Sequence, residues 1–161
     1  MDEHCSQVWA PTQVGLLAKL EAAQKRAIKW VYGISPTVSW SEETYHINLS
    51  NVSILPVHLH FLFNDLKLFY KVISGIINLD LPSYPTDIPY RTRAYSDIID
   101  LVDFTTVGCR AVEPLSSVFK NSFFVRTYPK WNDLPVEIRQ ASSLDVFSIR
   151  LKTRLFTTLN S

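Results

Sequence analysis

Apolar residues recur at helical spacing along much of the chain, and this pattern predicts a mainly α-helical protein. The strongest stretch begins at Pro56, a favoured first position of a helix, and continues to about Ile77. Its apolar members share one broad stripe, formed by Leu59, Leu62, Phe63, Leu66, Phe69, Tyr70, Ile73 and Ile76. We expect this helix to be the centre of the core.

Two further helices are expected on the N-terminal side. The first covers residues 11–32 and ends where Gly33 and Pro36 follow. Its apolar positions at helical spacing are Leu16, Leu17, Leu20, Ala27, Ile28 and Val31. The second is short, begins at Ser41 and fades near Asn48. Two glutamates occupy its first turn, where negative charge suits the positive end of the helix dipole.

The last third of the chain returns to helix. Two adjacent phenylalanines, an arginine and a Trp-Asn-x-Leu-Pro stop predict a short helix that is entered at Ser122 and ends near Pro135. Pro129 interrupts this helix, so we expect a kink or two short helical turns there. A final helix from about 143 to 159 carries basic residues on its outer face. Its apolar stripe is Leu144, Phe147, Leu151 and Leu155.

The middle of the chain differs in character from both ends. Pro82, Pro85 and Pro89 indicate a linker, and the β-branched residues of 98–107 favour one or two short β-strands. The expected segments are a helical segment at 1–79, a proline-rich linker at 80–96, and a C-terminal tail at 97–161 with short strands and two to three helices.

Composition is consistent with a folded chain and shows a charge asymmetry. The 161 residues are 47% hydrophobic and 12% aromatic, enough for a core. Net charge is +1, but from Arg110 onward eight Lys/Arg face four acids, which leaves +4 there and −3 in the remainder. Such asymmetry suggests an anionic partner at the C-terminal end, and a solvated helix face explains it equally well.

The cysteine content, the acidic first residues and the polar breaks in the longest apolar region limit the class of protein. Cys5 and Cys109 form neither a disulfide framework nor a zinc site. The acidic start does not resemble a signal peptide, and polar residues break the longest apolar region, so no membrane span is expected. We expect an intracellular chain, in the nucleus or the cytoplasm.

Candidate catalytic clusters are weak. Glu42 and Glu43 are explained by helix-end electrostatics, and Asp97, Asp100 and Asp103 lie among β-branched residues that disfavour a shared helix face. His58 and His60 are two residues apart, which places them on different faces of a helix. No nucleophile elbow or phosphate-binding glycine loop occurs. We therefore expect no catalysis by this chain alone, no metal site and no cofactor.

Basic residues beside aromatic ones form the remaining constellation. They occur after the proline-rich stretch, in the Phe/Trp string and on the last helix, at Arg91, Arg93, Arg126, Lys130, Arg150, Lys152 and Arg154. Phosphate contact combined with base stacking requires this mixture of residue types. In the alternative interpretation, Phe123, Phe124 and Trp131 are core residues and the cations only solvate the surface.

An ordered series of motifs runs along nearly the whole chain. The series is Val8-Trp9-Ala-Pro11, Leu20-Glu21-x-x-Gln24-Lys25-Arg26-Ala27, Leu55-Pro56, Asp65-Leu66, Phe69-Tyr70-Lys71-Val72-x-x-Gly75, Arg91-Thr92-Arg93, Asn121-Ser-Phe-Phe-x-Arg126, Trp131-Asn132-x-Leu134-Pro135 and Ser143-Leu144-x-x-Phe147. In order and spacing it resembles the C-terminal region, after the polymerase palm, of LINE-type (non-LTR, jockey-like) retrotransposon reverse transcriptases. The chain departs from that family at His60-Phe61, where paired arginines are usual, and it has no zinc knuckle.

The resemblance implies a thumb and tail region, a helical subdomain of a larger polymerase. The family's RNA-directed DNA polymerase uses Mg²⁺ at an aspartate pair that would lie before residue 1. The resemblance also implies contact with RNA or an RNA/DNA duplex, with Lys25 and Arg26 matching the family's basic pair. Apolar stripes without their usual neighbours would favour self-association. The other hypotheses are a host helical protein–protein interaction domain that uses the Phe/Trp motif, and a small independent enzyme.

Overall fold

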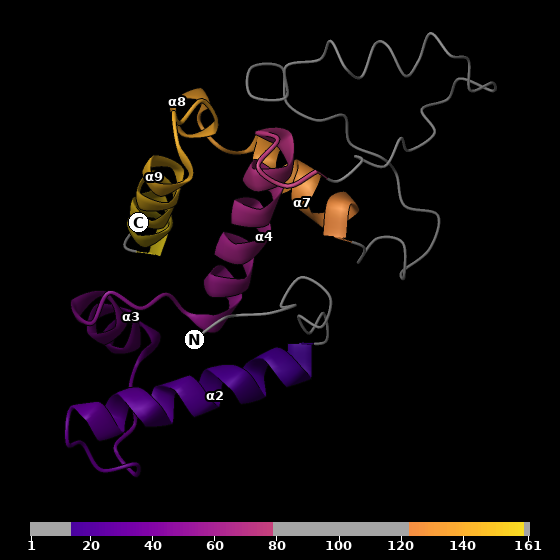
Figure 1. Cartoon of the computed structure of the whole chain (residues 1–161). Helices are drawn as coiled ribbons and strands as arrows, with labels where there is room; N and C mark the ends of the chain where they lie inside the picture. The colour runs from indigo at the N-terminus through magenta and orange to yellow at the C-terminus, as the bar shows by residue number, and fades with distance from the viewer. Residues whose placement is uncertain (1–13, 79–122, 160–161) are drawn as a thin grey trace, which may run out of the picture. The chain divides into compact units, whose positions relative to one another are not determined.

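The computed structural model describes residues 14–78 and 123–159, and these residues are mainly helical, as the sequence predicts (Figure 1). Within these two ranges there is no strand. The strands expected at 98–107 and the linker at 80–96 lie outside the described residues, as do Arg91 and Arg93. The helices are α2 (Val14–Val31), α3 (Glu42–Asn51), α4 (Val57–Ile73), α7 (Phe123–Asn132), α8 (Val136–Arg139) and α9 (Leu144–Leu159).

The predicted helix boundaries need two corrections. Helix α4 ends at Ile73, four residues early, because Gly75 takes a left-handed conformation (φ +67°) that suits glycine at a helix end. Helix α3 extends to Asn51, beyond the expected Asn48, and Leu49 is completely buried in this added turn. Local periodicity therefore located these helices but not their ends.

The chain divides into two compact units, and the division passes through α4 and α9. The described part of the first unit is residues 14–64 and 149–159, and that of the second is 65–78 and 123–148. The three linear segments expected from the sequence remain a prediction.

Aromatic packing around Phe69 forms the core of the second unit. Its ring meets the rings of Tyr128 and Trp131 edge-on, with centroids 5.4 and 5.1 Å away. Trp131 and Phe69 have no exposed surface. Edge-to-face pairs at such distances stabilise beyond the area that they bury. The Phe/Trp string of α7 is therefore a packing element.

A second contact within this unit fixes the start of α9. The rings of Tyr70 and Phe147 stack with centroids 4.4 Å apart, and the Tyr70 hydroxyl donates to the carbonyl of Ala141 at 2.6 Å. Ser143 precedes α9, and its hydroxyl accepts from the Val146 amide at 3.3 Å. These bonds satisfy polar groups where one helix has ended and the next begins.

Helix α7 runs through Pro129 as one helix, so of the two expected alternatives, a kink or two short helical turns, the division into two turns does not occur. Proline supplies no amide proton to the carbonyl four residues earlier, which normally disrupts a helix. Here Tyr128 and Trp131 on either side are buried, while Pro129 itself is exposed. Packing of the flanking aromatics holds the backbone helical despite the missing hydrogen bond.

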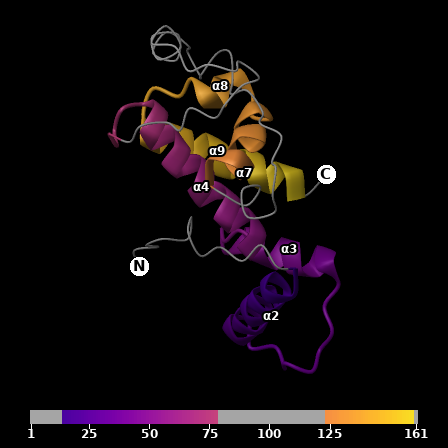
Figure 2. The same ribbon diagram turned by 90° about the vertical axis from the view of Figure 1, so that its right-hand side faces the viewer.

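In the first unit, α3 lies against α2 (Figures 1 and 2). Ile28, Tyr45 and Leu49 form the buried cluster, with Trp40 and Val52 packed around it. The hydroxyl of Ser41 accepts from the Thr44 amide at 3.1 Å and caps α3, as the sequence predicts. At its contact with α3, helix α2 thus buries only the side that carries Ile28.

Candidate nucleic-acid surface of helix α2

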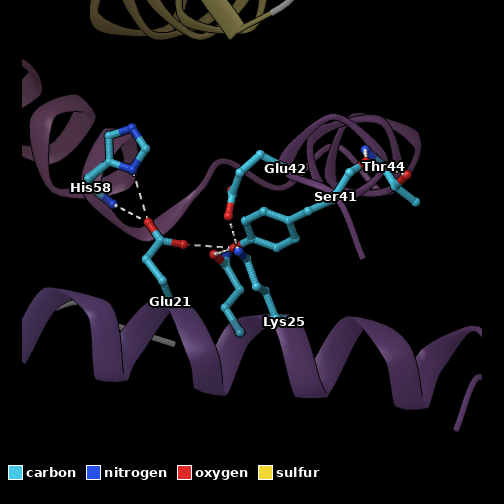
Figure 3. Close-up of polar contacts among 8 residues, drawn as sticks. Glu21, Lys25, Ser41, Glu42, Thr44 and His58 are labelled. Carbon is cyan, nitrogen blue, oxygen red and sulfur yellow. Dashed lines mark hydrogen bonds and ion pairs between the residues drawn. The ribbon is translucent and has the colours of Figure 1, made fainter. Parts of the chain in front are cut away.

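A polar network anchors α2 to the rest of the first unit (Figure 3). The Tyr45 hydroxyl lies 2.8 Å from Glu21 Oε2 and 2.6 Å from Gln24 Oε1, so one proton serves two acceptors. Gln24 also donates through Nε2 to the Leu55 carbonyl at 2.9 Å. Side chains one turn apart on α2 thereby reach both α3 and the segment before α4.

Glu21 also caps α4 from outside that helix. Its Oε1 accepts from the backbone amide of His58 at 3.2 Å and lies 2.9 Å from His58 Nδ1. The first amides of a helix lack partners within it, and a carboxylate there also meets the positive end of the helix dipole. The bond therefore ties the first turn of α4 to α2 within the first unit.

The network shifts two pKa values in opposite directions. Burial alone would raise the pKa of Glu21, but the hydrogen bonds from His58 and Tyr45 outweigh it and lower that pKa below its usual 4.5. Burial, then the hydrogen bond to Glu21, raises the pKa of Tyr45 far above its ordinary value. Glu21 is thus a carboxylate and Tyr45 a neutral donor at neutral pH.

The lysines beside this network serve the fold. Lys25 Nζ lies 2.5 Å from Glu42 Oε1 and 4.7 Å from the centre of the Tyr45 ring. Lys29 Nζ donates to the carbonyls of Pro36 and Val38. Both ammonium groups therefore face α3 or the turn after α2.

A hollow of about 330 Å³ adjoins the network. Its lining is Ala18, Glu21, Ala22, Lys25, Glu42, Tyr45, His46 and His58. Glu21 and Lys25 are engaged in the bonds above, and in the described ranges no three His, Cys, Asp or Glu side chains gather as a metal site would require. The hollow lies where α2, α3 and the first turn of α4 meet.

The opposite side of α2 presents a cation and an exposed aromatic ring. Arg26 is exposed, and Trp30, one turn later, is 84% exposed. Each helical residue advances by about 100°, so both lie roughly opposite the buried Ile28. An indole left so open in water is unusual, because tryptophan is one of the most strongly buried residue types on average.

The remaining candidate residues are divided between structural contacts and open surface. Arg126 pairs with Asp65 through Nε at 2.9 Å and Nη2 at 3.1 Å, so its guanidinium is already matched to a carboxylate. Lys152 is half-buried, with its ammonium 6.0 Å from the Phe156 ring. The exposed cations are Lys130, Arg150 and Arg154.

Two residues of interest were missed by sequence reasoning. Trp30 resembles a core residue in a hydrophobicity pattern, although its spacing of four from Arg26 places both on one face. Arg139 follows an isoleucine in a string of ordinary helix residues, yet it is only 7% exposed. Nothing local in the sequence signals that burial.

Comparison with family models, with curated proteins and with solved structures finds no match to this chain. Over residues 14–78 and 123–159, no helix is long and apolar enough to cross a membrane.

Proposed function

We propose that the chain is a non-catalytic C-terminal region of a LINE-type retrotransposon reverse transcriptase and that it binds RNA or an RNA/DNA duplex through α2. The ordered motif series supports the origin. The pairing of exposed Arg26 with Trp30, 84% exposed one turn away, carries the binding proposal. The larger polymerase would supply Mg²⁺ chemistry elsewhere, and we assign no catalytic residue here.

The chemistry of this face matches unpaired nucleotides, in single-stranded RNA or at the unpaired end of an RNA/DNA duplex. An exposed indole offers a flat surface on which a base stacks, and stacking contributes about 1–3 kcal/mol per base. Arg26 lies one helical turn from Trp30, and its guanidinium is suited to bind the phosphate next to the base that stacks on Trp30. Because Lys25 is bound to Glu42, Arg26 is the member of the basic pair that we assign to this contact.

A second candidate function is a helical protein–protein interaction domain. Its supporting observation is a row of exposed side chains on α2 at alternating spacings of four and three: Leu16, Leu20, Ala23, Ala27 and Trp30. This spacing is typical of a seam between paired helices. The surface would then be α2, because Trp131 of the Phe/Trp motif has no exposed area.

The test is binding of the purified chain to single-stranded RNA and to an RNA/DNA hybrid across a range of salt concentrations. We expect affinity to fall as salt rises, and Trp30→Ala to weaken it by about 5- to 150-fold. The matched control is Ile149→Ala, which removes another exposed apolar side chain of the first unit, 68% exposed on α9.

Two results would overturn the proposal. One is affinity that salt leaves unchanged, and the other is an equal effect of Trp30→Ala and Ile149→Ala. If both variants keep RNA binding and Trp30→Ala loses self-association, the results favour the interaction domain instead.

A further inference from the structure

Arg139 ends α8 with its side chain inside the second unit. The residue is 7% exposed. Its Nε and Nη1 atoms are buried and have no hydrogen-bond partner in the structure. Guanidinium stays protonated at any pH that a folded protein tolerates, so this is a buried positive charge with unmet donors. Buried charges in proteins are normally paired, and unpaired ones are strongly unfavourable.

Arg126, in the same unit, is a guanidinium with hydrogen-bond partners and serves as a comparison. It is 22% exposed at its side chain, and both donors of one edge bind the carboxylate of Asp65. Arg139 is more buried and has no such acceptor. The acids nearest to it in sequence with described side chains, Asp133, Glu137 and Asp145, are all exposed. Among the described residues, the half-buried Arg126 is therefore neutralised by a carboxylate, whereas the buried Arg139 is not.

We propose that Arg139 is a receptor for a phosphate group. A guanidinium holds an oxyanion by two parallel bonds either along Nε and Nη2 or along Nη1 and Nη2. Each of these edges includes one of the nitrogens that lack a partner. A bound phosphate satisfies such an edge and neutralises the charge in one step.

Local charge favours phosphate over a single carboxylate. The described residues of the second unit, 65–78 and 123–148, include five Lys/Arg and four Asp/Glu, so one positive charge of this unit is not balanced by an acid. A doubly charged anion gains more from that excess than a singly charged one. Arg139 belongs to the second unit, whereas the α2 surface belongs to the first.

The experiment measures the thermal unfolding midpoint of the full chain in inorganic phosphate and in chloride at equal ionic strength. We expect phosphate to raise the midpoint of the wild-type chain by about 5–10 °C at ~100 times its dissociation constant. Arg139→Met should abolish this response and raise the midpoint in chloride, because an apolar side chain replaces an unpaired charge. Arg150→Met, an exposed arginine on α9, is the matched control and should keep the response.

The same measurement with other anions identifies the chemical source of the phosphate group. A tetranucleotide that raises the midpoint of the wild-type chain but not that of Arg139→Met assigns a phosphodiester at Arg139, whereas an Arg139-dependent response to inorganic phosphate alone assigns a free phosphate or a monoester. A response to acetate and not to phosphate overturns the proposal and assigns a carboxylate. No response in the wild-type chain, or the same response in Arg139→Met, also overturns it.

A direct measurement covers the case in which Arg139→Met does not fold. The Nε–Hε signal of Arg139 in the wild-type chain, observed by nitrogen-15 magnetic resonance, should move on titration with phosphate. A signal that stays fixed at saturating phosphate contradicts the proposal.

Discussion

The guanidinium of Arg126 and the carboxylate of Asp65 meet along two parallel hydrogen bonds, 2.9 Å from Nε to Oδ2 and 3.1 Å from Nη2 to Oδ1. Asp65 is only 7% exposed, so its negative charge depends on this partner. Even so, burial outweighs the arginine and raises the pKa of Asp65 above its usual 3.8. The pair links α7 to α4 inside the second unit.

Removing only the arginine should be costly. Arg126→Met leaves Asp65 buried without a partner, and we expect a loss of about 3–5 kcal/mol in the free energy of unfolding at pH 7. The double variant Asp65→Asn with Arg126→Met should recover much of that loss, since no charge then stays buried. Urea unfolding of the four chains in a double-mutant cycle measures both effects, and equal stability of the single and double variants would refute the argument.

Lowering the pH should reduce the loss in free energy of unfolding that Arg126→Met causes. A raised folded-state pKa means that protonated Asp65 favours folding, and this contribution is full below the unfolded value near 3.8 and lost as pH rises through the folded value. Without Arg126 the folded value rises further. The stability difference between Arg126→Met and the wild-type chain should therefore shrink as pH falls from 7 towards 4, and a constant difference would contradict this assignment.

Glu21 should impose the opposite dependence. Its pKa is lowered in the folded state, so its stabilisation is present above the unfolded value near 4.5 and is lost as pH falls through the folded value. Glu21→Gln should cost about 1.5–3 kcal/mol at pH 7, the range for hydrogen bonds to charged groups, and flatten the acid side of the stability curve. Tyr45→Phe is the control, because the His58 bonds to Glu21 remain and most of the acid slope should persist.

The same substitution at two tryptophans should have different effects on stability. Trp131→Ala removes a side chain with no exposed surface, and we expect a loss of about 3–5 kcal/mol. Trp30→Ala removes one that is 84% exposed and should change stability by less than about 0.5 kcal/mol. Denaturant unfolding compares them directly, and similar losses would show that Trp30 has packing contacts in solution.

Substitutions of the adjacent residues Lys25 and Arg26 should differ in their effect on the salt dependence of RNA binding. Arg26→Gln should reduce the slope of log affinity against log salt by about 0.7–1, the value of one lost phosphate contact. Lys25→Gln removes the same charge from a side chain bound to Glu42 and should change the slope less. Slopes from binding titrations at several salt concentrations decide this, and a larger effect of Lys25→Gln would assign the contact to that residue.

Helix positions followed from local pattern because the stripe that faces the core is local. In α4, Leu66, Phe69 and Tyr70 occur within one turn and a half and are all buried. Periodicity reports such a face without knowledge of its partner. Helix α2 shows the limit of this reasoning: Leu16 and Leu20 belong to an equally regular stripe, and both are exposed.

The candidate site was harder to predict because its contacts join distant parts of the sequence. Asp65 lies 61 residues before Arg126, and Glu21 lies 37 residues before His58. A cation beside aromatics suggests a phosphate contact until its carboxylate partner is known. Lys25 and Arg26 are neighbours in sequence, yet a rotation of about 100° places one toward Glu42 and the other in solvent.

The burial of Trp131, in contrast to the exposure of Trp30, also makes the unfolding of the second unit observable by light. An indole in water emits at longer wavelength than one in an apolar interior, and dissolved iodide quenches only the former. Trp30 belongs to the first unit and Trp131 to the second. In a chain with Trp9, Trp30 and Trp40 replaced by phenylalanine, the emission colour and iodide quenching of Trp131 therefore report the unfolding of the second unit alone.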